Sequence, residues 1–367
     1  MQIWQRAVMS LWFLGLGCLP VLPQRLKQTP AKKTAIDSPG ALVLDNQGHL
    51  FVAQIYGDVV RRVDLRTNAM STVAGNGKAC CYRENTKAIE ASLDFPRALA
   101  VDSSDNLFIA EGGSIRKVDM HTGLISTFTT HAAETKEGVP VESVSFQRIT
   151  SLAIGSTGDL YVADDIQGRI FRVDGQSRNV SLVAGSGEQG FSGDGGPALR
   201  ASFRFIESIA LDGAGNLYVA DGENCRIRRV DHRTGVIQTV AITSEAKEEC
   251  PPPPGTNPLL PTPEDLAVGP DGNVYFVEPA MNVVVRLDKT NNLSIVAGTG
   301  GIGFSGDGGL ATDAELSGPS GLAIDSSGNL FVSDCRNNRI RRVDARTKVI
   351  SNTIAGDGFP HIIHAEE

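Results

Sequence analysis

Three carboxylate residues, Glu207, Glu264 and Asp265, lie where two successive copies of an internal repeat begin. Hard cations such as Ca²⁺ bind several oxygen ligands, most often carboxylates and carbonyls. If these side chains converge, they predict a Ca²⁺ site. The alternative is that they are solvated loop carboxylates, with Arg97 of an earlier copy as a counterion.

Two Gly-Asp-Gly-Gly loops place Asp194 and Asp307 among glycines. Such a loop could present its carboxylate and backbone groups to an ion or a glycan. It could equally be conformational, because glycine permits positive φ and an aspartate accepts hydrogen bonds from nearby N–H groups. Both residues are therefore candidates for ligand binding, with a structural role as the alternative.

Further acidic residues recur just before arginine-rich segments. They include Glu111, Asp164, Asp165, Asp221, Glu223, Glu278 and Asp334, and the arginines that follow include Arg169, Arg226 and Arg339. Arginine stems pack on apolar surface while their guanidinium groups pair with carboxylates. This pattern predicts partly buried structural ion pairs.

The cysteines suggest disulfides in an oxidising compartment. Cys225 lies between the second and third segments of the fourth copy and Cys250 in the loop that leaves this copy, so they are plausible partners. Cys80 and Cys81 could form a vicinal disulfide, leaving Cys335 free. The histidines lie in turns or near the C-terminus and lack the spacing of a zinc site. They are His49, His121, His131, His232, His361 and His364.

The elements that position these residues are set by the repeat itself. One marker, the residue before a Gly-Asn-Leu type turn, falls at Asp45, Asp102, Gly155, Asp212, Gly269 and Asp325, and an aspartate marker falls at Asp64, Asp119, Asp174, Asp231, Asp288 and Asp344. Both markers give six copies at one period of about 56 residues, which indicates a repeat architecture.

Each copy contains four short apolar segments separated by turn residues. In the fourth copy they span 208–212, 216–220, 226–230 and 236–240. Short segments enriched in β-branched and aromatic residues are typical of strands, and the Asn and Gly between them suit tight hairpins. Six copies of four antiparallel strands predict an all-β fold, a six-bladed β-propeller of four-stranded blades.

Alternate connections of an antiparallel meander lie at opposite ends of the strands. We call upper face the one that carries the second-to-third strand loops and the loops between blades. These loops are longer and more varied, so binding is expected there. The first strands should line the central channel, with Arg97, Glu207, Glu264 and Asp265 at its upper mouth.

The motif Gly-Leu-Ala-Ile-Asp-Ser-Ser-Gly-Asn-Leu-Phe-Val-Ser-Asp at 321–334, followed by Asn-Arg-Ile-Arg-Arg-Val-Asp at 338–344, resembles the NHL repeat. The loops at 183–196 and 296–309 resemble those of NHL propellers in secreted bacterial proteins and in teneurins. The resemblance implies a binding platform. It also admits an enzyme, since gluconolactonase-like propellers hold a metal at this end of the channel.

Residues 1–23 resemble a secretion signal, because a basic start precedes an apolar run too short to span a bilayer. A lipoprotein-like segment ending at Cys18 offers lipid anchoring as an alternative. Residues 24–36 are interpreted as a linker, 37–358 as the propeller and 359–367 as a C-terminal tail. No transmembrane segment is expected in the mature chain.

The net charge of −8 and the lack of a basic run argue against nucleic acid as a partner. We therefore expect a secreted or periplasmic monomer that binds a protein, peptide or glycan through its upper-face loops, with no cofactor. The alternative is a metal-dependent hydrolase or lyase whose site, with Ca²⁺, lies at Glu207, Glu264 and Asp265.

Overall fold

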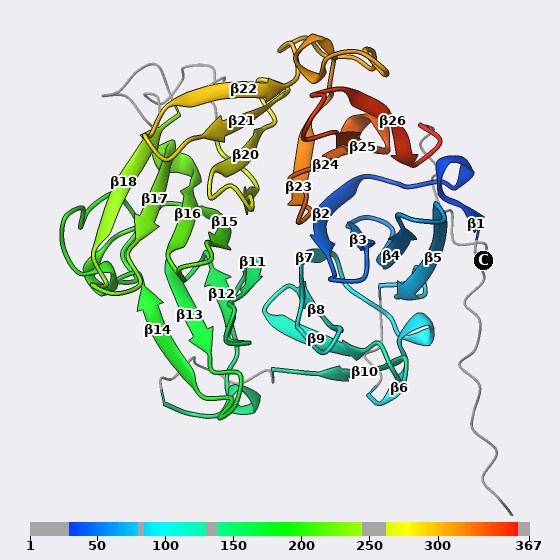
Figure 1. Ribbon diagram of the computed structural model, residues 1–367. Helices are drawn as coiled ribbons and strands as arrows, with labels where there is room; N and C mark the ends of the chain where they lie inside the picture. Colours follow the sequence, from blue (N-terminus) through cyan, green and yellow to red (C-terminus); the bar gives the residue numbers. More distant parts are fainter. Residues whose placement is uncertain (1–28, 80–83, 130–137, 244–261, 359–367) are drawn as a thin grey trace, which may run out of the picture.

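The computed structural model describes residues 29–79, 84–129, 138–243 and 262–358. Six antiparallel sheets are arranged in a ring, with the first strand of each sheet innermost, as Figure 1 shows. The predicted six-bladed β-propeller is therefore confirmed. In the described residues the only helices are short 3-10 turns between strands: η1 (Ala31–Lys33), η2 (Ala88–Glu90), η3 (Val141–Ser143), η4 (Ala198–Arg200), η5 (Gly222–Asn224), η6 (Ala311–Asp313) and η7 (Cys335–Asn337).

Within each blade the strands are paired in chain order from the channel outward. Blade one contains β2 (Pro39–Leu44), β3 (His49–Gln54), β4 (Val59–Asp64) and β5 (Ala69–Ala74). Blade two contains β7 (Pro96–Val101), β8 (Asn106–Glu111), β9 (Ser114–Asp119) and β10 (Leu124–Thr127). Blade three contains β11 (Ile149–Ile154), β12 (Leu160–Asp164), β13 (Arg169–Val173) and β14 (Val180–Ala184).

The second half of the ring repeats this order. Blade four contains β15 (Ile206–Leu211), β16 (Leu217–Asp221), β17 (Arg226–Val230) and β18 (Ile237–Ile242). Blade five contains β19 (Leu266–Val268), β20 (Val274–Glu278), β21 (Val283–Leu287) and β22 (Leu293–Ala297). Blade six contains β23 (Pro319–Ile324), β24 (Leu330–Asp334), β25 (Arg339–Val343) and β26 (Ile350–Ala355).

The recurring aspartate fixes the turn between the first two strands of a blade. The Oδ1 atom of Asp212 accepts hydrogen bonds of 2.9 Å from the N–H groups of both Ala214 and Asn216. Gly215 takes a φ of +83°, which favours glycine. The same Asp-x-x-Gly-Asn chemistry explains why the hairpins could be located from the sequence.

The core lies between blades rather than inside one. One cluster joins Tyr161, Ala163 and Ile170 of blade three to Ile206 and Val219 of blade four. A flat sheet exposes two faces, and each blade buries both by packing against two neighbours. The structure thus holds every first strand at the channel through contacts on either side of it.

The ring closes through the residues that precede blade one. The Gly356 N–H of blade six donates to the Ala31 carbonyl at 3.1 Å, and the Ala31 N–H donates to the Asn68 carbonyl of blade one at 2.9 Å. The short strand β1 (Thr29–Pro30) pairs with β5, and β6 (Thr86–Lys87) pairs with β10 in the same way. Segment 29–33 therefore joins the first blade to the last.

Candidate functional site

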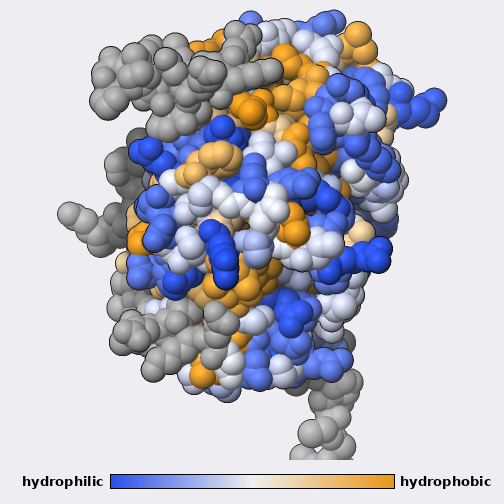
Figure 2. All heavy atoms as spheres, turned by 90° about the vertical axis from the view of Figure 1, so that its left-hand side faces the viewer, coloured by the Kyte–Doolittle hydropathy of each residue, from blue (hydrophilic) through white to orange (hydrophobic). Residues whose placement is uncertain are grey.

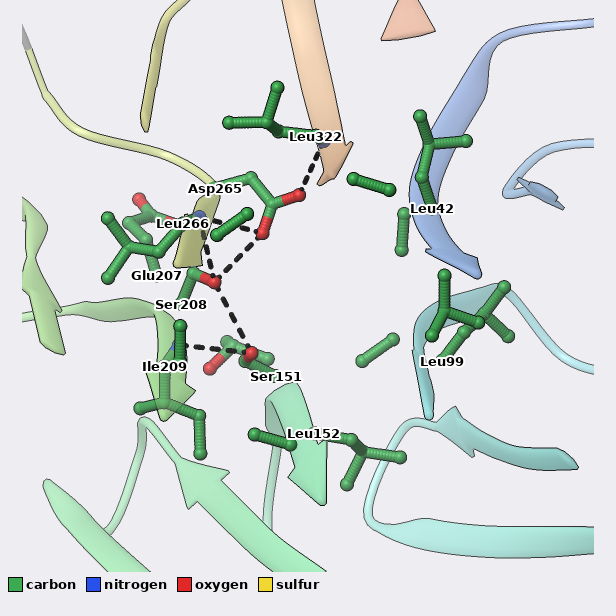
Figure 3. A pocket seen from close by; sticks show the side chains of 18 of the residues that line it. Leu42, Leu99, Ser151, Leu152, Glu207, Ser208, Ile209, Asp265, Leu266 and Leu322 are labelled. Atoms are coloured by element: carbon green, nitrogen blue, oxygen red, sulfur yellow. Dashed lines mark hydrogen bonds between the residues drawn. The ribbon is translucent and has the colours of Figure 1, made fainter. Parts of the chain in front are cut away.

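The upper mouth of the channel opens into a cavity of about 480 Å³. The first strand of every blade contributes to its wall, as Figure 3 shows. A buried aliphatic residue from each strand takes part: Leu42, Leu99, Leu152, Ile209, Leu266 and Leu322. The polar lining residues include Arg97, Arg148, Glu207, Glu264 and Asp265, so the predicted mouth residues do line one cavity.

Hydrogen bonds link successive blades around this mouth. Ser151 Oγ accepts the Ile209 N–H at 3.1 Å, and Ser208 Oγ accepts the Leu266 N–H at 3.2 Å. These two serines and Asp265 occupy the same position of blades three, four and five. Each side chain therefore satisfies an N–H group of the next blade.

Asp265 is the acidic member of this series. Its Oδ1 atom accepts a 2.8 Å hydrogen bond from the Ser208 hydroxyl, and its Oδ2 atom accepts the Leu322 N–H at 2.8 Å. Burial raises the pKa of Asp265 to about 6, and these hydrogen bonds oppose the rise. Asp265 thus links blades four, five and six through its hydrogen bonds.

Glu207 and Glu264 differ, because in the described residues neither side chain has a hydrogen bond or ion pair. Burial raises the pKa of Glu207 to about 8, and repulsion from Glu264 adds to the rise. Burial also raises the pKa of Glu264 to about 7, with repulsion from Asp265 as the second cause. The mouth therefore presents two carboxyl groups that hold protons near neutral pH.

The two arginines of the mouth, Arg97 and Arg148, differ in their surroundings. Arg97 is exposed, as a residue free to meet a ligand would be. Arg148 was not predicted from the sequence. It pairs with Asp165 and lies over the Phe205 ring at 4.9 Å, beside Glu207. No sequence signal marks Arg148, since its role follows from the approach of two blades.

The side chains predicted to bind Ca²⁺ do not form a recognisable set of metal ligands among the described residues. In the described part of the chain, no group of three or more His, Cys, Asp or Glu side chains is arranged to hold a metal ion. Asp265 already accepts three hydrogen bonds, from Ser208, Leu266 and Leu322. The Ca²⁺ site at Glu207, Glu264 and Asp265 stays a prediction.

The two Gly-Asp-Gly-Gly loops bind arginine side chains of the propeller. Asp194 accepts a 2.8 Å hydrogen bond from Arg228, and Asp307 accepts one of 2.6 Å from Arg341. Both guanidinium groups are fully buried. These contacts give the two aspartates a structural role, and their predicted ligand binding is not tested by this geometry.

The arginines that the sequence singled out are partly buried, as predicted, but they are not the fully buried ones that pair with the carboxylates. Arg169, Arg226 and Arg339 are only partly buried and bond to the backbone carbonyls of Ser186, Asn224 and Asp357. The carboxylate pairs are instead made by Arg116, Arg228 and Arg341, two residues further along the third strands. Positions two apart share a face of a strand, so the pattern alone could not separate them.

Two of the five cysteines that follow Cys18, Cys225 and Cys335, lie among the described residues. Cys225 is disulfide-bonded, and its predicted partner Cys250 lies outside the described residues. Cys80 and Cys81 also lie outside them. Cys335 carries a free thiol, as expected.

Comparison with known proteins gives the family. The teneurin NHL domain matches residues 58–145 and 147–301, and the NHL repeat matches residues 316–343. Teneurin-3 of Danio rerio is 28% identical over 331 residues, which covers 83% of this chain and 11% of the relative. Teneurin-m of Drosophila melanogaster is 30% identical over 282 residues, covering 70% of this chain and 10% of the relative. The chain thus spans a small part of the teneurins that it matches.

Solved structures agree on the fold alone. A streptogramin B lyase superposes with a TM-score of 0.53 at 13% identity, covering 89% of this chain and 86% of that one. An auxiliary nutrient binding protein of Bacteroides thetaiotaomicron gives 0.57 at 16% identity, covering 84% and 69%. A nidogen/laminin complex gives 0.54 at 14% identity, covering 83% and 92%. The family match extends over more than half of the chain, and the protein belongs to the teneurin NHL domain family.

Proposed function

We propose that this propeller is a non-catalytic platform that binds a polypeptide across its upper face. The observation that carries the proposal is the set of exposed apolar side chains on the upper loops. Tyr56 and Ile302 are each 71% exposed, the two highest values among the exposed large apolar side chains of the described residues. The others are Phe95, Ile166, Phe191, Met281 and Phe304.

These side chains come from both kinds of upper loop. Tyr56, Ile166 and Met281 follow second strands, and Phe191 and Ile302 lie in loops between blades. Aromatic and aliphatic side chains at such positions are typical of protein interfaces, where polar groups set orientation. The mouth supplies those polar groups through Arg97, Glu207 and Glu264. Figure 2 shows that the outer rim on the β14 and β18 side also mixes apolar patches with hydrophilic residues.

Two of the solved structures that share the fold support this proposal, because one is a binding protein and the other is a complex. One of the similar folds is that of a protein solved in a nidogen/laminin complex, and another is a nutrient binding protein. A glycan ligand in place of a polypeptide would use the same loops.

A lyase or hydrolase is the second candidate, because streptogramin B lyase shares the fold. One related structure is a virginiamycin B lyase made inactive by replacing a histidine. Of the histidines that the structure describes, His49 begins β3, and His121 and His232 lie in turns between third and fourth strands, so all three are at the strand ends opposite the upper face. This favours the platform.

We also propose secretion, on the grounds of the signal-like residues 1–23. The described part of the chain has no helix that could cross a bilayer.

The platform can be tested with paired surface variants. Secreted polypeptides captured by the immobilised protein would be identified, and their binding remeasured with Tyr56→Ser and Ile302→Ser. Binding should weaken by tenfold or more in both. Leu293→Ser and Leu124→Ser are matched controls, since these leucines are 42% and 41% exposed on outer strands. Equal loss in all four variants would contradict upper-face binding.

The same protein would be analysed for metal. Bound Ca²⁺ that is lost in Glu207→Ala or Glu264→Ala would favour the enzyme instead.

A further inference from the structure

Blade five departs from its neighbours at one buried position. The last residue of the second strand is Glu111, Asp164, Asp221 and Asp334 in blades two, three, four and six, and Glu278 in blade five. In the first four, the carboxylate accepts a backbone N–H from the segment that leads into the mouth. The donors are Asp94 at 2.9 Å, Gln147 at 2.7 Å, Arg204 at 2.9 Å and Ser317 at 2.7 Å.

A guanidinium group adds a second partner in three of these blades. Arg116 lies 3.4 Å from Glu111, Arg228 lies 3.5 Å from Asp221, and Arg341 lies 3.8 Å from Asp334. Blade three has Phe171 in place of the arginine, and Asp164 is satisfied there by Gln167 and by N–H groups. Each of these four carboxylates is thus compensated by donors or positive charge.

Among the described residues, Glu278 has neither kind of partner. The residue that matches the three arginines is Val285, which has no polar group. In the part of the chain that the structure describes, no backbone N–H donates to the Glu278 carboxyl group either. Glu278 is only 2% exposed, and its Oε2 atom has no hydrogen-bond partner among the described residues.

An unpaired carboxyl at this depth is held as the neutral acid. Burial raises the pKa of Glu278 to about 8, and burial is the one cause of that rise. Glu278 itself pairs with the apolar Val283 of β21, and Arg286 of that strand pairs with Tyr275, three residues away. Glu264 and Asp265 lie on the segment bonded to Val277, and none of these charged residues is a cause of the rise.

The position of Glu278 connects it to the mouth. Its neighbour Val277 accepts the Glu264 N–H at 3.1 Å and donates to the Asp265 carbonyl at 3.1 Å. In blade five the first strand is reduced to three residues, Leu266–Val268, whereas the first strands of the other blades have six. These two hydrogen bonds are therefore the main attachment of Glu264 and Asp265 to their own blade.

We propose that the protonation state of Glu278 controls how the mouth segment Glu264–Asp265 is attached to blade five. The segment stays attached while the Glu278 carboxyl is neutral and is released when that carboxyl ionises. Loss of the proton places an uncompensated charge inside the blade, and the cheapest relief is to expose the end of β20 to water. The upper mouth then changes shape with pH.

The pH range follows from linkage. The folded blade keeps the Glu278 proton up to a pKa of about 8, whereas the opened blade releases it near the ordinary value of 4.5. Between these values the opened state binds fewer protons, so its population rises as pH rises, by up to about tenfold per pH unit. Opening is suppressed below about pH 4.5 and levels off above pH 8.

Amide hydrogen exchange tests the proposal without any ligand. Protection factors at Glu264, Leu266 and Val277, corrected for intrinsic exchange, would be compared at pH 5 and pH 8 in the full chain. The wild type should lose protection there by at least about tenfold, with about 400-fold as the linkage limit for pKa values of 4.5 and about 8. Glu278→Gln, which keeps the shape without the charge, should lose markedly less.

Two controls isolate Glu278. Glu207 and Glu264 titrate in the same range but persist in Glu278→Gln, so the difference between the two proteins is the readout. Glu111→Gln, in blade two, should leave the blade-five profile as in the wild type. Identical blade-five profiles for wild type and Glu278→Gln would overturn the proposal.

If Glu278→Gln fails to fold, the carboxyl carbon of Glu278 in the wild type would be titrated by NMR. A midpoint near 4.5 would then overturn the proposal, and one near 8 would support it.

Discussion

The Ser208 hydroxyl of blade four donates a 2.8 Å hydrogen bond to the Asp265 carboxylate of blade five. Asp265 in turn accepts the Leu322 N–H of blade six. Two side chains therefore connect three blades at the mouth. This arrangement makes the mouth a part of the propeller's framework. The side chains of Glu207 and Glu264 beside it form no such inter-blade hydrogen bond among the described residues.

Replacing Asp265 should test that framework. Asp265→Ala leaves the Leu322 N–H without its acceptor and should lower the free energy of unfolding by about 1–3 kcal/mol. Chemical denaturation would measure it. Glu188→Ala, at an exposed glutamate of an upper loop, is the control and should have little effect. A neutral result for Asp265→Ala would show that the bonds contribute nothing net.

The buried arginines should be more sensitive. Arg341→Ala leaves the buried carboxyl of Asp334 without its charge partner, 3.8 Å away, and removes the pair with Asp307. Breaking a buried pair from one side typically costs about 3–5 kcal/mol.

The partly buried Arg342 on the same strand is the matched control, with an expected cost below about 1 kcal/mol on replacement by Ala. Similar losses for the two variants would contradict the importance of burial.

The mouth glutamates predict a pH-dependent stability. The folded protein holds the proton of Glu264 up to a pKa of about 7, above the ordinary value of 4.5. The stability that this protonation contributes is complete below pH 4.5 and is lost as pH rises to 7.

Glu264→Gln should therefore be more stable than the wild type at pH 7.5, and the gain should vanish near pH 4.5. Partial exposure reduces the expected gain to about 1–2 kcal/mol. Melting temperatures across this pH range would check it, and parallel curves for the two proteins would refute it.

Much of the fold could be predicted from the sequence because its signals are local. The turn that Asp212 and Gly215 build is encoded within five residues, and its recurrence counts the blades. The placement of Arg97, Glu207, Glu264 and Asp265 at one mouth followed from strand direction alone.

What could not be predicted depends on contacts between blades. Whether Asp265 accepts hydrogen bonds from Ser208 and Leu322, or is available to bind a metal ion, depends on the register between neighbouring sheets. Likewise, Arg226 and Arg228 share a strand face, and only the depth of the inter-blade groove makes the second one fully buried. The missing partners of Glu278 become visible only when equivalent positions are superposed.

The seam at Ala31 should be a weak point of the ring. Ala31→Pro removes the N–H that Asn68 accepts and should lower the melting temperature, with a cost of about 1–3 kcal/mol. The matched variant is Ala88→Pro, since Ala88 bridges blades one and two by the same pair of backbone hydrogen bonds.

Ala31→Pro should expose blades one and six together to proteolysis, whereas Ala88→Pro leaves them joined. Equal proteolysis patterns would contradict a special role for the seam.

The bond between Gly356 and Ala31 also constrains how a growing polypeptide reaches its final shape. Partners 325 positions apart have to meet, so this joint forms only after nearly all of the repeat array has emerged from the ribosome. Until then, the outermost sheets have an unshielded apolar side each. Assistance from a chaperone would matter most during that interval.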